Sequence, residues 1–432
     1  MGKASLPFPS LVVPLVLLLL PLSRSASVVT HLPGFHGRLP LHLETGYVGV
    51  DEETGAELFY YFVESERSPE TDPLILWMTG GPFCSGMIFF EVGPMKFVLA
   101  PYNVGTGFSY ARDVKGYHDI GDFSFSMHVV IFLNKWFTDH PHYQSNPFFV
   151  GGSSYAGKMS PIIAQHISQE IELGKQPRIN LKGYVVGNPV TGSDYDDNFR
   201  VPYAHGVGII SDQLYEAAIL NCKGSYIRPT NKMCVRVLNT FQNLVSEIDV
   251  PQILGVNCIR GMLTHKFLSE EYTQLSDPSP EQPTIDCFSY RYYLCNIWAN
   301  DDSTREALGV KRGTTREFIR CKKSIPYASE VPSSIKYHFN LTSRGYRALV
   351  FSGDHDLVIP FLSTHAWIRS FNFSVVDDWR AWHLDGQAAG FTITYANYMT
   401  FATVKGGGHV SIEHRPKQCL AMVQRWLDNE PL

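Results

Sequence analysis

The sequence predicts an α/β protein with a mostly parallel central sheet that is covered by helices on both faces. Two observations support this prediction. Short apolar runs that are typical of buried strands alternate with longer stretches in which apolar residues recur at helical spacing. Residues 195–335 interrupt this alternation and hold six of the eight cysteines, which indicates an inserted cap region that carries its own disulfides.

The elements follow one another in a regular order along the chain. Buried or half-buried strands are expected at residues 42–52, 57–65, 72–78, 146–152, 179–187 and 347–354, and within 391–404. Helices are expected at 123–139, 158–173 and 414–429, and from Leu362 onward. A turn at 53–55 joins the first two strands, Pro141 follows the first helix, and Gly174 closes the second.

Composition and charge limit the classes of partner. The chain has 432 residues, of which 44% are apolar and 18% charged, so it can bury the core of one large domain. Its net charge of −5 and the lack of any Lys/Arg cluster argue against nucleic acid or a stable membrane partner. No cysteine or histidine cluster has zinc spacing, so neither a metal nor a cofactor is predicted, and the oligomeric state is not indicated.

The N-terminal residues have the features of a cleaved signal peptide. Lys3 precedes an apolar run at 11–20, and small residues follow at 23–26. The run is short for a membrane span, which disfavours an N-terminal anchor. Export through the secretory pathway fits the even number of cysteines and the glycosylation sequons at Asn340 and Asn372. The predicted organisation is a signal peptide at 1–26, a core at 27–194, the cap region at 195–335 and the rest of the core at 336–432.

The segment GGSSYAGK places two serines between a predicted strand and a predicted helix. A chain that turns at once from strand to helix strains the turn residue, and the residues two positions away must be small. Gly152 and Ala156 meet this need if Ser154 is the turn residue. With Ser153 in that place, Tyr155 would occupy a position that requires a small side chain. Ser154 is therefore the predicted nucleophile.

A nucleophilic serine needs a base, and the base needs an orienting carboxylate. In a sheet of this kind the chain order is Ser, then Asp or Glu, then His. Asp354 and Asp356 follow one late strand; Asp356, deeper in the loop, is the predicted carboxylate and Asp354 a turn-former. His409 follows another strand in a glycine-rich loop and is the predicted base. The backbone amides of Tyr155 and Gly81 are predicted to form the oxyanion hole.

These motifs together resemble the serine carboxypeptidase family of α/β-hydrolases. The likeness spans nearly the whole mature chain and is carried by LPGFHGRLPLHLETGYVGV, TGGPFCSG, VGTGFSYA, GGSSYAGK, GYVVGNP, WANDDSTREALGV, FSGDHDLVIPF and VKGGGHVSIEHRP. It implies an α/β-hydrolase fold with the triad Ser154, Asp356 and His409. The resemblance also implies three disulfides: Cys84–Cys321, Cys222–Cys234 and Cys258–Cys287. It leaves two cysteines without a family partner, Cys295 and Cys419.

The positions that hold substrate depart from the family's carboxypeptidases. Those enzymes bind a peptide's terminal carboxylate with an Asn before the paired glycines, a Glu before the nucleophile and a second Glu. Here Thr79 precedes the pair that begins at Gly80, Ser153 precedes the nucleophile, and only Glu91 remains. A lone Glu has no partner carboxyl with which to share a proton, so it repels a carboxylate near neutral pH.

The chain is also similar to plant carboxypeptidase-like acyltransferases of secondary metabolism, in LETGYVGV, FSGDHDLVIPF and WIRSFNFSVVDDW. That resemblance implies small-molecule partners: an acyl-glucose donor, 1-O-linked, and a hydroxyl-bearing acceptor. It also favours the vacuole over the extracellular space. The alternative is a serine-type carboxypeptidase.

Two further departures concern the oxyanion loop and the sheet. Phe83 stands where the family has a glycine, so the loop is either displaced or Phe83 fills part of the acyl pocket. Between Pro94 and Val104 the chain is too short to supply a strand that family members carry within the sheet. Either the local structure is rebuilt, or the chain is a spliced or mis-assembled product. A third interpretation is therefore an inactive, non-catalytic variant.

Overall fold

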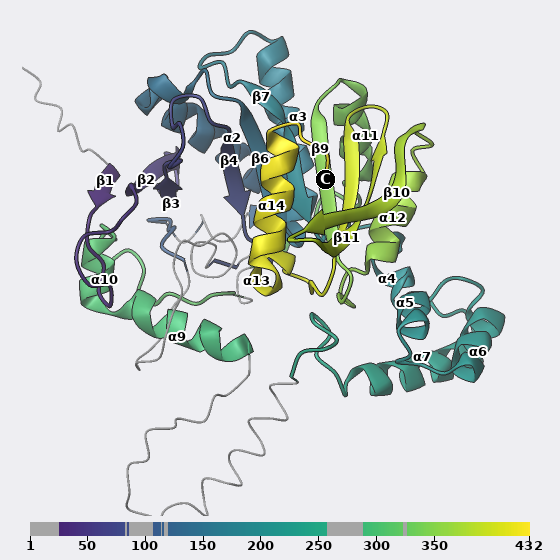
Figure 1. Ribbon diagram of the computed structural model, residues 1–432. Coiled ribbons are helices and arrows are strands. Elements are labelled where there is room, and N and C mark those ends of the chain that lie inside the picture. Colours follow the sequence, from purple (N-terminus) through teal and green to yellow (C-terminus); the bar gives the residue numbers. More distant parts are fainter. Residues whose placement is uncertain are drawn as a thin grey trace, which may run out of the picture.

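The computed structural model describes most of the chain after the predicted signal peptide (Figure 1). The described residues are 26–82, 84–85, 107–113, 115, 120–256, 288–322 and 326–432. Predictions that fall on residues 1–25, on Phe83, Glu91, Cys258 or Cys287, and on the segment between Pro94 and Val104 lie outside these residues.

A seven-stranded sheet forms the centre of the described fold. Its order is β10-β11-β12-β9-β7-β6-β4, and the five strands from β12 to β4 are parallel. Their bounds are β4 Leu74–Met78, β6 Phe148–Ser153, β7 Leu181–Gly187, β9 Arg347–Gly353, β12 Met399–Val404, β11 Gln387–Tyr395 and β10 Val375–Leu384. The predicted mostly parallel sheet is confirmed.

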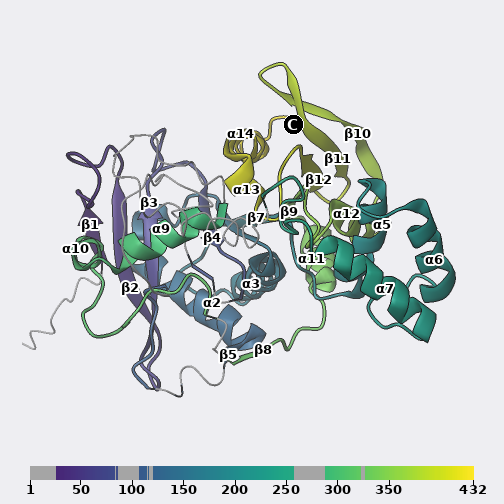
Figure 2. The ribbon, with the colours of Figure 1, turned by 90° about the horizontal axis from the view of Figure 1, so that it is seen from below.

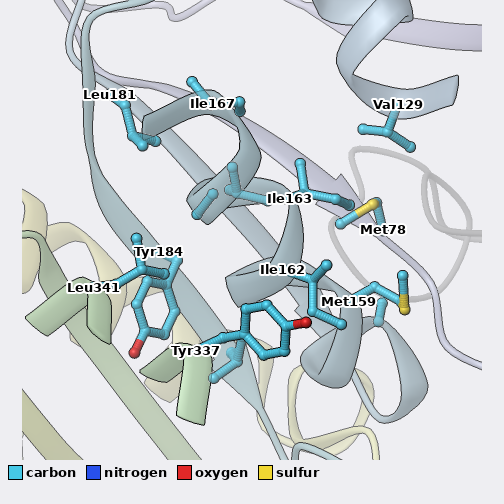
Figure 3. Close-up of a cluster of buried hydrophobic side chains, with 14 of the residues drawn as sticks. Met78, Val129, Met159, Ile162, Ile163, Ile167, Leu181, Tyr184, Tyr337 and Leu341 are labelled. Atoms are coloured by element: carbon cyan, nitrogen blue, oxygen red, sulfur yellow. The ribbon is translucent and has the colours of Figure 1, made fainter. Parts of the chain in front are cut away.

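Two buried side-chain layers show that helices cover both faces of this sheet. On one face, α2 (Asp122–Asp139), α3 (Tyr155–Glu172), α11 (Ile335–Ser343) and α12 (Phe361–Arg369) pack against the strands. Figure 3 shows Ile162 and Ile163 of α3 among Met78, Val129 and Tyr184 in this layer. On the other face, α14 (Pro416–Leu427) contributes Met422 and Trp426 against Phe149 and Val185.

A separate antiparallel sheet holds the early strands of the chain. Its order is β1 (Ala26–Val29), β2 (Leu43–Asp51) and β3 (Ala56–Val63), which confirms the predicted pair of strands joined by a turn. Figure 2 shows this sheet set apart from the seven-stranded sheet. A short parallel pair, β5 (Ile120–Gly121) and β8 (Tyr327–Ala328), lies next to α2.

Strand β4 differs from the prediction of a buried strand. Four of its five residues are only half-buried, whereas all six residues of β6 are buried. The physical reason is its position, because β4 ends the seven-stranded sheet and pairs only with β6 among the described residues. A further difference is β10, which the sequence did not predict; it is the other edge strand of the described sheet, and half of its residues are exposed.

The described residues of the predicted cap region form two groups of helices on opposite sides of the fold (Figures 1 and 2). The first group, next to α12, contains α4 (Asp194–Asn198), α5 (Arg200–Gly206), α6 (Asp212–Cys222) and α7 (Lys232–Val245). The second, near the early strands, contains α9 (Phe288–Asn300) and α10 (Asp302–Ala307). Within the described ranges, the chain has no helix with the length and hydropathy needed to span a membrane.

Candidate active site

The turn between β6 and α3 places Ser154 in a strained backbone conformation. Its φ of 58° and ψ of −121° lie where L-residues are rarely found, and the helix begins at the next residue. A Cβ on Gly152 would lie 2.6 Å from the Cβ of Ala156, so only a small residue fits there. This is the crowding that the sequence argument for Ser154 required.

Three side chains from distant parts of the chain meet at this turn. The Ser154 Oγ lies 2.8 Å from Nε2 of His409, and Nδ1 of His409 lies 2.8 Å from Oδ2 of Asp356. With the proton on Nδ1, the imidazole donates to the carboxylate and its Nε2 accepts from the serine hydroxyl. The carboxylate is fully buried and the imidazole nearly so. The arrangement can therefore activate a serine for attack on an acyl carbon.

Asn188 fixes the carboxylate of this relay, and sequence reasoning did not single it out. Its Nδ2 donates to Asp356 Oδ2 at 2.8 Å, while its Oδ1 accepts from Ser411 Oγ at 2.8 Å and from the Gly353 amide. The amide of Val358 donates to the other carboxylate oxygen at 2.7 Å. Asn188 follows β7 with a φ of 42°. The Gly-Asn-Pro sequence after that strand was the available signal, because Asn tolerates this conformation.

The loop that carries His409 is held from two sides. Asp354 accepts a hydrogen bond from the Gly406 amide at 2.6 Å, which ties the two sheet-end loops together. The His409 amide donates to the carbonyl of Pro251 at 2.6 Å, so a residue of the predicted cap region also holds this loop. Burial raises the pKa of the Asp354 carboxyl. Asp354 thus braces the loop, while Asp356 faces the histidine.

The predicted oxyanion loop, residues 79–82, lies directly against the nucleophile turn. A Cβ on Gly80 would lie 2.7 Å from Ser154 Cβ and 3.0 Å from the Tyr155 amide nitrogen, so this position requires glycine. Gly81 has a φ of 131°, another conformation that favours glycine. The amide of Tyr155 is the first of the α3 helix, where backbone N–H groups have no helical partner. These features can place two donors near an ester oxygen.

A buried ion pair anchors the start of α3. Lys158 Nζ lies 3.0 Å from Asp122 Oδ2, and both side chains are almost fully buried. Asp122 also accepts hydrogen bonds from the hydroxyls of Tyr155 (2.6 Å) and Tyr327 (2.8 Å) and from the Val331 amide (2.9 Å). Burial alone would raise the pKa of the Asp122 carboxyl, but these hydrogen bonds outweigh burial and hold it below its usual range.

A cavity of about 270 Å³ opens beside the triad. Thr79, Ser153, Arg320 and Glu413 contribute to its lining. Burial raises the pKa of the Glu413 carboxyl; one of its oxygens accepts from the Tyr292 hydroxyl at 2.7 Å, and the other has no hydrogen-bond partner among the described residues. The Thr79 hydroxyl is likewise buried without a partner in the described part of the chain. The cavity therefore offers polar atoms that a substrate could satisfy.

The cysteines follow the expected pairing where the structure describes them. Disulfides join Cys84 to Cys321 and Cys222 to Cys234. The first joins Cys84, two residues after the predicted oxyanion loop, to Cys321 in the predicted cap region. Two free cysteines are buried: Cys295 and Cys419. Both sequon asparagines, Asn340 and Asn372, lie exposed.

The parallel sheet, the strained serine at a strand-helix turn and the histidine-aspartate relay define an α/β-hydrolase fold. A prohormone-processing carboxypeptidase from Saccharomyces cerevisiae has a similar structure, with a TM-score of 0.67 at 18% identity over 90% of this chain and 91% of that one. The serine carboxypeptidase family pattern matches residues 33–103 and 97–429. The chain therefore belongs to the serine carboxypeptidase family.

Curated relatives from Arabidopsis thaliana cover nearly the full length. Serine carboxypeptidase-like 9 is 42% identical over 456 positions, which cover 98% of this chain and all of the relative. Serine carboxypeptidase-like 2 is 44% identical over 94% of each chain. The first alignment is longer than the 432 residues of this chain, so at least 24 of its 456 positions lie opposite a gap here. This chain thus lacks residues that the relative has.

Proposed function

We propose that the protein is an acyltransferase that moves an acyl group from a 1-O-glucose ester to a hydroxyl acceptor through a serine acyl-enzyme. The observation that carries the proposal is the relay from Ser154 through His409 to Asp356, with 2.8 Å at each step, beside a cavity lined by Thr79 and Ser153. Neither of these two side chains can share a proton with a peptide carboxylate as a carboxyl group does. A neutral ester needs no such shared proton, so these two positions favour an ester over a peptide end.

The first half of the reaction forms the acyl-enzyme. Ser154 Oγ attacks the ester carbonyl and passes its proton to Nε2 of His409, and Asp356 stabilises the imidazolium. The amides of Tyr155 and Gly81 stabilise the negative charge on the carbonyl oxygen. The bond to the glucose oxygen then breaks, and His409 protonates that oxygen as glucose leaves.

The second half transfers the acyl group. The acceptor hydroxyl attacks the acyl carbon, and His409 Nε2 takes the hydroxyl proton. The bond to Ser154 Oγ breaks, and the imidazolium returns its proton to the serine. Water attacking in the same way would give hydrolysis, so transfer requires an acceptor that occupies the cavity beside the triad.

A serine-type carboxypeptidase is the second candidate. The observation that favours it is Arg320, whose guanidinium group lines the same cavity and could attract a carboxylate. That guanidinium lies 3.6 Å from the centroid of the Tyr292 ring, which fixes its position beside the cavity. The two candidates differ in the charge of the leaving group that His409 protonates. The acyltransferase releases neutral glucose, whereas the carboxypeptidase releases an amino acid that carries a carboxylate.

We also infer that the protein passes through the secretory pathway to the vacuole or the extracellular space. The inference is supported by the two disulfides, which persist in oxidising compartments, and by the signal-peptide features of residues 1–26. The exposed side chains of Asn340 and Asn372 are accessible to glycosylation.

The test incubates the full-length protein with a panel of glucose esters and hydroxyl acceptors, and in parallel with blocked dipeptides. The expected result is an acyl-acceptor product that Ser154→Ala abolishes. The matched control is Ser168→Ala on the same helix, about 20 Å further along at 1.5 Å per residue. Efficient release of C-terminal residues, without transfer from any ester, would overturn the proposal in favour of a carboxypeptidase.

A further inference from the structure

The cavity beside the triad contains a buried carboxyl group that the proposed reaction does not yet use. Glu413 lies on the short helix α13 (Ser411–His414), which begins just after His409. Its side chain is only 8% exposed, and it lines the same cavity as Ser154 and His409. The carboxyl group therefore borders the space in which a substrate meets the serine and the histidine.

One carboxyl oxygen of Glu413 is held by the protein, and the other is left for a ligand. Oε2 accepts a hydrogen bond from the Tyr292 hydroxyl at 2.7 Å, which fixes the orientation of the carboxyl group. Oε1 is buried and has no hydrogen-bond partner among the described residues. A buried polar atom without a partner is unfavourable, so such an atom at a cavity ordinarily meets a ligand or water. Oε1 is thus placed to hydrogen-bond with a molecule that enters the cavity.

The charges around the cavity favour a neutral ligand that carries hydroxyl groups. Among the described lining residues, one guanidinium group, that of Arg320, accompanies the two carboxyl groups of Asp249 and Glu413. Burial raises the pKa of both carboxyl groups, and it lowers the pKa of His414, which also lines the cavity. A carboxylate ligand would meet two acidic groups. A hydroxyl group both donates and accepts, so it suits the guanidinium and either protonation state of a carboxyl group.

The two halves of the proposed reaction place the leaving group and the acceptor in the same space. His409 Nε2 first gives a proton to the glucose oxygen and later takes one from the acceptor hydroxyl. This nitrogen lies 2.8 Å from Ser154 Oγ, the atom that carries the acyl group, so both oxygens must lie beside it in turn. The cavity has a volume of about 270 Å³. Sites for drug-sized ligands have roughly 300–1,000 Å³, so this one suits a single molecule of the size of a sugar.

We propose that Glu413 Oε1 forms a hydrogen bond with a second hydroxyl group, first of the departing glucose and then of the acceptor. The inference rests on the acyltransferase function proposed above and adds the class of acceptor: a polyhydroxy compound, such as a sugar or another polyol, rather than an alcohol with one hydroxyl group. The buried Thr79 hydroxyl, which lines the same cavity without a partner in the described part of the chain, can bind a further hydroxyl group. Glu413 thereby selects the acceptor, whereas Ser154 and His409 carry the bond changes.

The test starts from an acyl-enzyme that is made without glucose. The full-length protein is acylated with p-nitrophenyl acetate, and the acetyl group is offered to cyclohexanol or to trans-1,2-cyclohexanediol, which differ by one hydroxyl group. We expect transfer to the diol to exceed transfer to cyclohexanol at least about 10-fold per hydroxyl group, the effect of one hydrogen bond to a buried carboxyl group. Equal transfer to the two alcohols, or hydrolysis without transfer to either, would overturn the inference. The acyltransferase function is tested separately, by transfer from glucose esters, so the two can fail independently.

A pair of variants assigns the preference to Glu413. Glu413→Leu keeps a similar side-chain volume but cannot hydrogen-bond, so the preference for the diol should disappear. The readout is the ratio of the two transfer rates, because a structural disturbance slows both reactions alike. The matched control is Tyr292→Phe, which removes the hydroxyl group bound to Oε2 and keeps Oε1, so the preference should persist.

Two results with these variants would overturn the assignment. One is a preference for the diol that survives in Glu413→Leu, and the other is a preference that is lost in Tyr292→Phe alone. If Glu413→Leu does not fold, the comparison of the two alcohols in the unaltered protein still decides whether a second hydroxyl group is bound.

Discussion

The prediction that the structure makes most sharply concerns Asp122→Asn. The Asp122 carboxylate accepts four hydrogen bonds, two at each oxygen, and one donor is the buried ammonium of Lys158. Asparagine keeps one oxygen and turns an NH₂ group toward two of the donors. Two hydrogen bonds are lost, each worth about 1.5–3 kcal/mol at a charged group. The ammonium loses its countercharge at the same time, and removing one partner of such a buried pair, with the lost hydrogen bonds included, costs about 3–5 kcal/mol in total.

The assay is urea unfolding of the purified protein at neutral pH. We expect the free energy of unfolding of Asp122→Asn to fall by about 3–5 kcal/mol. The matched control is Glu172→Gln, which breaks the half-exposed pair with Arg344 and should cost less than about 1 kcal/mol. Adding Lys158→Met to Asp122→Asn should recover part of the loss, because it removes the unpaired charge. A free energy of unfolding for Asp122→Asn that lies within about 1 kcal/mol of the parent's would refute this reasoning.

The same pair predicts a pH dependence. Because hydrogen bonds hold the pKa of Asp122 below its ordinary value of 3.8, the folded state favours the charged carboxylate. The stability that it contributes is present above pH 3.8 and is lost as the pH falls through the lower, folded-state pKa. The stability difference between the parent and Asp122→Asn should therefore narrow only in strong acid. A difference that disappeared near neutral pH would contradict this assignment.

Three further predictions concern the candidate site and use the rate at which a fluorophosphonate labels Ser154. Gly80→Ala should slow labelling and lower the free energy of unfolding by about 1–3 kcal/mol, because its Cβ would lie 2.8 Å from a backbone oxygen. The control is Gly49→Ala, whose Cβ would have no atom within 4 Å, and it should change neither quantity. Asn188→Ala should slow labelling roughly 100-fold by loosening the relay, and an unchanged rate would show that the amide only packs. Replacing Cys84 and Cys321 by serine should cost about 2–5 kcal/mol and slow labelling, while removal of the other described disulfide, which closes a 12-residue separation far from the site, should leave labelling unchanged.

The sequence could indicate that Ser154, Asp356 and His409 lie together, because their signals are local or follow chain order. Crowding around Ser154 depends on residues two positions away, so the choice over Ser153 could be made from the sequence. Asp356 and His409 follow strands whose ends meet at the same edge of a parallel sheet. The sheet order itself then brings the three side chains together.

The remaining features depend on contacts between distant residues, which no local pattern contains. Asp122 and Lys158 come from different helices, and a charged residue in a helical stretch ordinarily faces water. The apolar composition of β4 predicted burial, but burial also needs a neighbour on each side. Strand β10 was missed because its charged residues obscure the alternation of apolar and polar side chains that marks a strand. Charged residues of this kind are common in edge strands.

The central claim is that Ser154 becomes acylated by a glucose ester and passes the acyl group on. The most direct measurement is mass spectrometry of the protein quenched during turnover, with and without an acceptor alcohol. The account predicts an added mass equal to the acyl group on the peptide that contains Ser154, which declines when the acceptor is added. An unmodified serine under every ester tested, in protein that a fluorophosphonate still labels, would contradict the acyl-glucose assignment.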